Sequence, residues 1–185
     1  MASLSLAGDT SGSITISAPS VAGTNTITLP ANTGTVITTA STFGGTGPSF
    51  SVTRATSTQS FTASTWTVIA YNSENWDTNN NFDTSNYRFT PTVAGYYQIN
   101  VNVGLIFTGT STVTGVGIYK NGSIYCINVP YATFNTNSIL SVSGIVYLNG
   151  STDYITGNVY SNGTSPSVNN ALHETQMSGS LIRSA

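Results

Sequence analysis

The sequence predicts an all-β protein, and three observations carry that prediction. β-Branched and aromatic residues recur along the chain, which suits the pleated, half-buried surface of a sheet. Apolar and polar residues alternate in several runs, and no stretch shows the 3.6-residue period of an amphipathic helix. Glycine and Asn-Gly steps separate these runs at short intervals. Many short strands with such turns indicate an antiparallel sandwich, barrel or jelly roll.

The clearest strand is predicted over residues 96–107. Apolar residues alternate there with polar or small ones, which is the period of a strand with one buried face. We expect the apolar set to pack in the core or in a trimer contact, and we assign Phe89 to the same group. The set within the strand is Tyr97, Ile99, Val101, Val103, Leu105 and Phe107.

Eight further strands are predicted in the C-terminal part of the chain. Asn-Gly steps at residues 121–122, 149–150 and 162–163 fall between neighbouring runs, and Asn-Gly supplies the positive φ angles of tight hairpins. All three steps are therefore predicted to be hairpin turns. The strands are expected at residues 49–53, 65–71, 87–90, 113–120, 123–129, 138–148, 154–160 and 176–183.

The first 41 residues differ from the rest. Short alternating runs at residues 13–17, 24–29 and 35–38 lie between glycines and prolines, and aromatic residues are lacking. One copy of such a segment buries little core, so we expect it to need other copies of itself or a larger assembly. The predicted organisation is a β-rich attachment or shaft segment over residues 1–41, a linker over 42–48 and a head domain over 49–185.

The chain is poor in charge, and this excludes several classes of partner. Charged residues make up 5% of the sequence, so Ser, Thr, Asn and Gly must hydrate most of the surface. The four basic residues are scattered, which argues against nucleic acid. No apolar run is long enough for membrane insertion, and the N-terminus lacks the pattern of a signal peptide. We therefore expect synthesis in a cytoplasm without secretion.

The sequence offers no catalytic constellation, so we predict that the protein is not an enzyme and needs no cofactor. The one histidine, His173, stands beside Glu174 in a predicted loop. The one cysteine, Cys126, lies in an alternating strand and should act as a small apolar side chain. Six acidic residues in the whole chain make a paired-carboxylate hydrolase difficult to build.

A polar run over residues 72–83 is the candidate metal site. Four of its side chains have the one-three-five-seven spacing of an EF-hand loop. The other EF-hand positions do not fit, because Phe82 stands in place of the glycine and Arg88 in place of the final glutamate. Either these side chains bind Ca²⁺, or they cap turns. The four residues are Asp77, Asn79, Asn81 and Asp83.

Four aromatic residues form the candidate receptor-binding set. They lie near predicted turns or strand ends, where saccharide-stacking residues are often found. The alternative is that they pack in the core or in a trimer contact, because aromatic residues dominate both. The four are Trp76, Tyr131, Phe134 and Tyr160.

A series of short motifs keeps one order from about residue 48 to residue 185. Phe50–Arg54 begins it, Gly95–Tyr97 precedes the long alternating strand, and Ser178–Ile182 ends it. Asn75, Phe82–Thr90, Pro91, Gly117–Gly122 and Ser143–Gly150 lie between them.

This series resembles the globular head of complement 1q, in the tumour-necrosis-factor-like jelly-roll superfamily. The resemblance implies a jelly-roll sandwich of about ten strands that assembles as a homotrimer and buries aromatic residues along its threefold axis. Tyr87 departs from the family, which usually has glycine there, and Ser151 stands where an acid is usual. The collagen-like stalk of the animal proteins is absent, so complement-type ligand binding does not carry over.

The N-terminal segment is similar to a short module of phage tail-fibre and other virion proteins. The similarity rests on Gly12–Ile16, Ala18–Pro19, Val21–Ala31 and Thr33–Val36. It implies an anchor or shaft that contacts other virion proteins.

Together the two resemblances predict a bacteriophage virion structural protein, made in the host cytoplasm. It would be a trimeric surface knob of a tail or head fibre that contacts a host-surface glycan or protein. One alternative is a capsid decoration protein that stabilises the head at threefold positions. A second alternative is a free carbohydrate-binding module.

Overall fold

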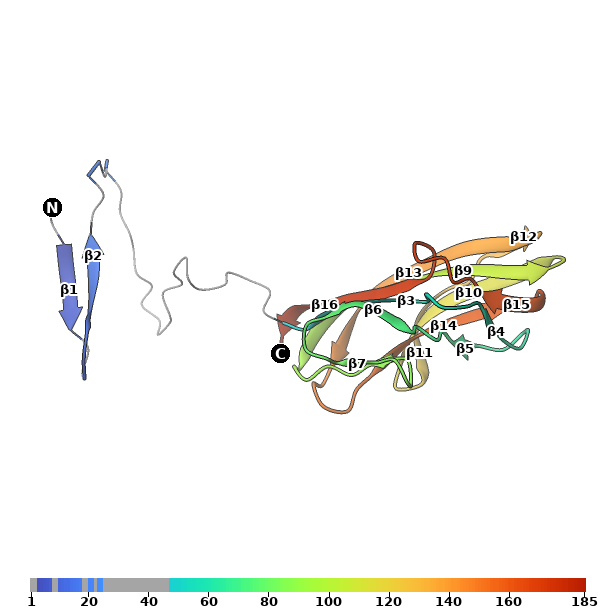
Figure 1. Ribbon diagram of the computed structural model, residues 1–185, viewed down its shortest axis with the longest axis horizontal. Coiled ribbons are helices and arrows are strands. Elements are labelled where there is room, and N and C mark those ends of the chain that lie inside the picture. Colours follow the sequence, from blue (N-terminus) through green and yellow to red (C-terminus); the bar gives the residue numbers. More distant parts are fainter. Residues whose placement is uncertain (1–2, 8–9, 18–19, 22, 25–46) are drawn as a thin grey trace. The chain divides into compact units, whose positions relative to one another are not determined.

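The computed structural model is all-β, as the sequence predicts (Figure 1). The chain divides into two compact units, Met1–Ser41 and Thr42–Ala185. No helix that is long and apolar enough to cross a membrane occurs in the described part of the chain. The structure describes residues 3–7, 10–17, 20–21, 23–24 and 47–185.

The N-terminal unit contains an antiparallel pair of strands, β1 (Ser3–Ala7) and β2 (Ser13–Ser17). β2 coincides with a predicted run, whereas β1 was not predicted. Leu6 and Ile16 are both more than half exposed, so this pair alone leaves apolar surface in water. The other two predicted runs and most of the predicted linker fall on residues 25–46, outside the described residues.

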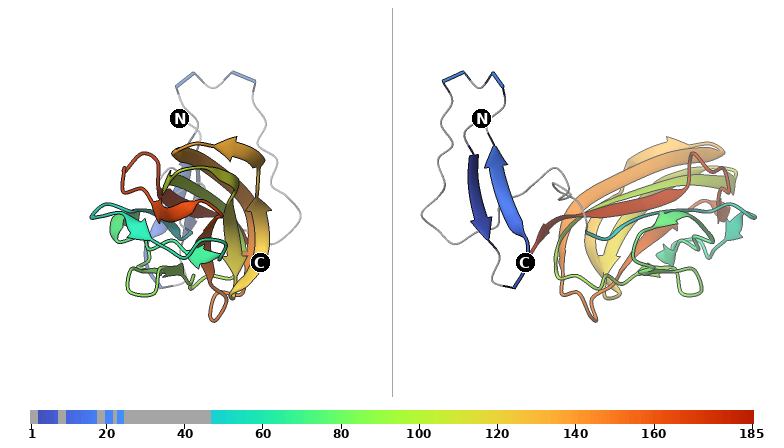
Figure 2. Two further views of the ribbon diagram at one scale, coloured as in Figure 1. Left: turned by 90° about the vertical axis from the view of Figure 1, so that its right-hand side faces the viewer. Right: turned by 60° about the vertical axis from the view of Figure 1, so that its left-hand side comes forward.

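The head is a sandwich of two seven-stranded antiparallel sheets (Figures 1 and 2). Four of its fourteen strands have only two residues, which leaves ten longer strands, as predicted. The first sheet has the order β11-β10-β14-β8-β7, with β12 beside β10 and β5 beside β14. Its strands are β5 (Thr67–Val68), β7 (Phe82–Asp83), β8 (Arg88–Phe89), β10 (Ser111–Lys120), β11 (Ser123–Asn128), β12 (Tyr131–Phe134) and β14 (Ile155–Ser161).

The second sheet has the order β4-β15-β9-β16-β3-β6, with β13 beside β9. β9 is its centre, because β13 follows one edge of β9 while β16 and then β15 follow the other. The strands of this sheet are β3 (Ser49–Thr53), β4 (Gln59–Ser60), β6 (Ser73–Asp77), β9 (Gly95–Thr108), β13 (Asn137–Leu148), β15 (Thr164–Val168) and β16 (Gln176–Ser184).

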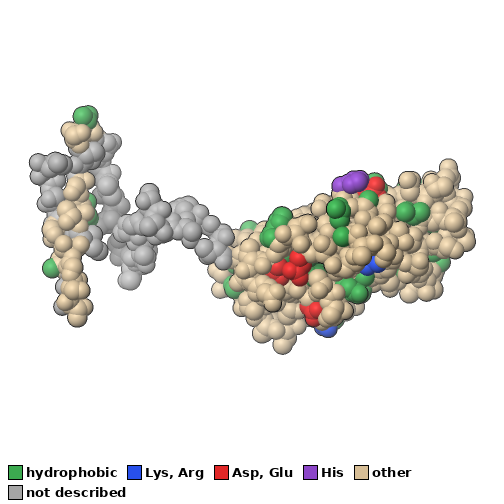
Figure 3. Space-filling model, in the orientation of Figure 1, with side chains coloured by type: hydrophobic (Ala, Val, Ile, Leu, Met, Phe, Trp, Pro, Cys, Tyr) green, Lys and Arg blue, Asp and Glu red, His purple; other side chains and the backbone are tan. Residues whose placement is uncertain are grey.

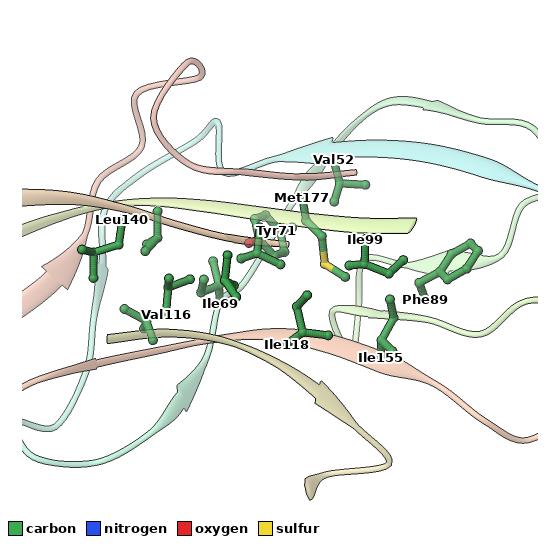
Figure 4. Packing of buried hydrophobic residues seen from close by; sticks show 14 of the residues in the cluster. Val52, Ile69, Tyr71, Phe89, Ile99, Val116, Ile118, Leu140, Ile155 and Met177 are labelled. Carbon is green, nitrogen blue, oxygen red and sulfur yellow. The ribbon is translucent and has the colours of Figure 1, made fainter. Parts of the chain in front are cut away.

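The core lies between the two sheets, where Ile118 and Ile155 of the first sheet approach Ile99 and Met177 of the second (Figure 4). The seven apolar side chains predicted to pack in the core or in a trimer contact are all at most 3% exposed, so they lie inside the protomer. The Tyr97 hydroxyl donates a hydrogen bond to the Val93 carbonyl at 2.7 Å, and burial raises the pKa of Tyr97 to about 12.

The Asn-Gly steps have two different structures. Asn121 and Gly122 have φ angles of +51° and +79° and join β10 to β11, as predicted for a hairpin. The hairpin prediction is wrong at residues 149–150 and 162–163, because each step links strands of opposite sheets. Asn149 Oδ1 instead accepts three backbone N–H groups of its own loop, and Asn162 Oδ1 accepts two from the start of β10.

Other predicted boundaries also change. The polar run at residues 72–83 is not a single loop, since it contains β6 and β7. The strand predicted at residues 65–71 shrinks to β5, because Ile69 and Tyr71 are fully buried core residues in an irregular segment. β6 pairs with β3 through a register shift, and such irregular pairing leaves no clear alternation in sequence.

Side chains of the first sheet cover the free edge of β13. The hydroxyl of Tyr125 and the amide of Asn128 donate to the carbonyls of Ile145 and Ser141 at 2.6 and 3.0 Å. Lys120 Nζ donates to the carbonyl of Tyr147 at 2.8 Å, and the Cys126 thiol lies 3.9 Å from the carbonyl oxygen of Ser143. An edge with satisfied carbonyls is a poor template for pairing with another chain.

Tyr87 gives a prediction about backbone strain. Its φ is +60°, which costs a residue other than glycine about 1–2 kcal/mol. Tyr87→Gly and Tyr87→Ala both remove the aromatic ring, but only glycine relieves the strain. After subtracting the greater entropy of unfolded glycine, about 0.4–1 kcal/mol, we expect Tyr87→Gly to be the more stable variant by about 1 kcal/mol. Urea unfolding measures the difference, and an alanine variant of equal or greater stability would contradict it.

Asp153 gives a prediction about pH. Lys120 and Asn121 donate to its carboxylate at 2.9 and 2.7 Å, and these bonds hold the pKa of Asp153 below its ordinary value of 3.8. Because the folded pKa is lowered, the stabilisation is present above pH 3.8 and is lost as the pH falls through the folded pKa.

Asp153→Asn should therefore reduce the fall in melting temperature below about pH 4. The effect on the free energy of unfolding should be less than about 1 kcal/mol, because the Asp153–Lys120 pair is near the surface. Glu74→Gln, which changes an exposed carboxyl on β6, is the matched control and should keep the wild-type profile. Equal acid sensitivity in Asp153→Asn and wild type would show that this carboxylate does not carry the effect.

Candidate functional site

An open groove of about 560 Å³ lies on the outer face of the first sheet. It is bordered by the β11–β12 connection on one side and by the segment before β5 on the other. Its walls are aromatic and aliphatic, and no charged side chain lines it. The lining residues are Trp66, Val113, Ile127, Val129, Tyr131 and Tyr160.

Trp66 has its position because Gly115, in the strand beneath it, has no side chain. Gly115 of β10 pairs with Tyr160, and a Cβ atom at Gly115 would lie only 2.8 Å from Cη2 of Trp66. The indole therefore lies against the backbone of β10. Its ring centroid is 5.5 Å from that of Tyr160 and 5.7 Å from that of Tyr119, so it packs against two further aromatic rings.

The structure brings together only two of the four predicted receptor-binding residues. Tyr131 and Tyr160 both line the groove, and the side chain of Tyr131 is 82% exposed. Trp76 lies on β6 in the other sheet, and Phe134 of β12 is partly buried against the core. Sequence reasoning missed Trp66. The available signal was Gly115-Val116-Gly117, because alternate glycines in a strand leave room for a large side chain.

The groove lies toward the end of the head that is remote from the chain's entry. The chain enters the head where the Pro48 carbonyl accepts from Leu181 N, and Ser184 near the C-terminus pairs with Gly95 at the start of β9. β9 runs from that end to the β9–β10 turn at the other, and Val113 follows this turn (Figure 1).

The second sheet carries a separate apolar face on its outer surface. Tyr96 and Tyr147 pair across β9 and β13 with ring centroids 5.5 Å apart. Tyr96, Ile145 and Ile182 line one depression of about 540 Å³. We call the exposed apolar side chains of β9, β13 and β16 the outer apolar face. It consists of Tyr96, Ile106, Ile139, Ile145, Tyr147 and Ile182, each 38–64% exposed.

The predicted calcium ligands are engaged in local turns. The Asp77 carboxylate accepts from the N–H groups of Asn79 and Phe82, at 3.2 and 2.6 Å, and the Asn81 side-chain N–H donates to the Asn79 carbonyl. Asp83 accepts from the hydroxyl and N–H of Ser85, which lower its pKa. In the described residues no three His, Cys, Asp or Glu side chains form a metal cluster. Calcium binding at this loop stays a prediction.

Of the residues considered for catalysis, His173 and Glu174 are neighbours in the β15–β16 loop, and Cys126 lies on the other sheet. The His173 side chain is 84% exposed, with its Nε2 3.7 Å from Glu174 Oε1. The other oxygen of Glu174 accepts from the Asn169 amide at 2.6 Å. Cys126 lies in β11 and packs against the core, as a small apolar side chain would. Figure 3 shows how few charged groups the visible face of the head carries.

Comparison with known proteins defines the class of fold. No family model matches the chain, and no curated sequence matches it significantly. The globular domain of a zebrafish complement 1qA protein is similar in structure, with a TM-score of 0.54 and 15% identity over 75% of this chain and 99% of that one.

Two further solved structures are similar. Murine APRIL has a TM-score of 0.57 and 11% identity, over 74% of this chain and 99% of its own. Eiger TNF from S. frugiperda has a TM-score of 0.56 and 10% identity, over 75% and 95%. The head therefore has the jelly-roll fold of complement 1q and tumour-necrosis-factor-like domains.

Proposed function

We propose that the protein is a non-enzymatic structural component of a bacteriophage particle, with its head assembled as a homotrimer and exposed at the particle surface. In this proposal the head takes part in attachment to the host surface. The N-terminal segment joins the head to other virion proteins. No signal peptide is needed, because assembly takes place in the host cytoplasm.

The outer apolar face is the observation that supports the proposed trimer. Six large apolar side chains on three neighbouring strands, in one cluster toward each end of the face, leave a monomer with apolar surface exposed to water. A closed ring of identical subunits covers the same patch on every copy without leaving one exposed. The fold of the head, which is that of a family expected to form homotrimers, supports the same assembly.

The polar part of this face is also suited to burial. Asn100 of β9 pairs with Ser143 of β13 and Ser178 of β16, so small uncharged groups lie between the apolar residues. Arg183 is the one charged residue of these three strands. A face with almost no ions avoids the large cost of removing charges from water.

The N-terminal unit supports the attachment role assigned to it. An isolated two-stranded sheet is marginally stable in water, and β1–β2 exposes Leu6 and Ile16. Covering these residues with other copies or with a particle protein would stabilise the pair. The sequence resemblance to a tail-fibre module favours a fibre over capsid decoration.

The trimer is tested by the solution mass of the full-length protein. We expect three times 19.2 kDa for the wild type. Ile145→Asp places a charge in the outer apolar face and should produce a monomer that keeps its β-sheet circular dichroism. Leu172→Asp is the matched control, because Leu172 is 57% exposed but lies outside the face. A monomeric wild type, or a trimer unaffected by Ile145→Asp, would overturn the assembly.

Location is tested separately with antibodies against the head and gold labelling of purified particles. Label at tail or head fibres is the expected result. Label distributed over the capsid surface would select the decoration protein, and particles without label would return the free carbohydrate-binding module to first place.

A further inference from the structure

The aromatic groove of the first sheet has the chemistry of a ligand site. We propose that it binds a neutral saccharide, with the apolar C–H face of a sugar ring stacked on Trp66 and against Tyr131. This inference rests on the proposed function, in which such a saccharide would belong to the host surface.

The composition of the groove selects an uncharged occupant. None of its six lining residues carries a charge, so an ionic ligand would lose hydration there without gaining an opposite charge. A purely apolar ligand would form no hydrogen bond with the hydroxyls of the two tyrosines in the lining. A neutral sugar has both an apolar face for the rings and hydroxyl groups for Tyr131 and Tyr160.

Trp66 is held in place before any ligand arrives. Its indole lies against Gly115 and packs against Tyr119 and Tyr160, so binding costs little side-chain entropy at this residue. A rigid aromatic platform beside a few polar groups is the usual composition of a small-ligand site.

Tyr131 is the complementary part of the site. Its side chain is 82% exposed at the start of β12, and it is the most exposed aromatic side chain of the head. An aromatic ring gains by leaving water, and a ligand that covers it would supply that gain. Tyr131 thus forms an exposed wall of the groove, which a bound ligand would cover.

The groove and the outer apolar face lie on different sheets. Assembly through the second sheet is therefore compatible with a groove open to solvent on each subunit. The groove also lies toward the end of the head remote from the chain's entry, where a surface ligand can approach.

The two tryptophans of the chain provide a specific assay. A panel of neutral hexose and N-acetylhexosamine oligosaccharides, with sialylated and sulfated counterparts, is printed on an array and incubated with the full-length protein. Each bound oligosaccharide is then titrated into Trp76→Phe, in which Trp66 is the one remaining indole. We expect a saturable change in Trp66 fluorescence.

Variants identify the residues that bind. Tyr131→Ala should weaken binding about tenfold, the upper range for one aromatic contact. Because the Tyr131 side chain is exposed, the variant should keep the wild-type fold, and circular dichroism checks this. Trp66→Phe should weaken binding too, while its remaining Trp76 reports no change. Trp76→Phe should retain wild-type affinity on the array.

The inference would be overturned if no neutral oligosaccharide binds or if charged oligosaccharides bind more tightly than neutral ones. It would also be overturned if Tyr131→Ala and Trp66→Phe bind with wild-type affinity, or if Tyr131→Ala dissociates an assembly larger than a trimer. The last result would identify another copy of the chain as the occupant. A trimer present on particles but without saccharide binding would remove this inference and leave the proposed function. Saccharide binding by a protein that is absent from particles would keep this inference and remove the proposed function.

Discussion

The pairing of β9 on both edges is the constraint on which the head depends. β13 follows one edge from Gly95 to Ile106, while β16 and β15 divide the other. A shift of one residue in either register would turn the core side chains of the shifted strand toward solvent. The alternation of β9 therefore fixes two surfaces at once, a core between the sheets and an outer face that stays exposed in the single chain.

The scarcity of charge creates a second constraint, because proteins commonly protect exposed strand edges with charged side chains. Here one lysine and three uncharged side chains of the first sheet cover the carbonyls of β13. Asp153 joins this region to the β13–β14 loop through Lys120, Asn121 and the N–H of Asn149. Local hydrogen bonds thus replace the long-range repulsion that a charged surface would provide.

Sequence reasoning predicted the parts of the fold that depend on local alternation. β9 and β13 have clear two-residue periods, and both lie within about two residues of their expected bounds. It failed at Asn149 and Asn162, which resemble Asn121 in sequence. Asn149 caps its own loop between the two sheets, and Asn162 accepts from the start of β10. β6 was hidden because its polar residues suggested turns, and its pairing with β3 is irregular.

The candidate site was predictable only in part for a similar reason. Tyr131 and Tyr160 stand out as aromatic residues near strand ends, but the position of Trp66 depends on Gly115, which lies 49 residues later on another strand. Alternate glycines in β10 remove the side chains that would otherwise fill the outer face of the first sheet. The same sheet can then hold an aromatic platform outside while Val116 and Ile118 fill the core inside. Assembly and binding can therefore use separate sheets of one sandwich, and with so little charge both must rely on shape, apolar contact and neutral hydrogen bonds.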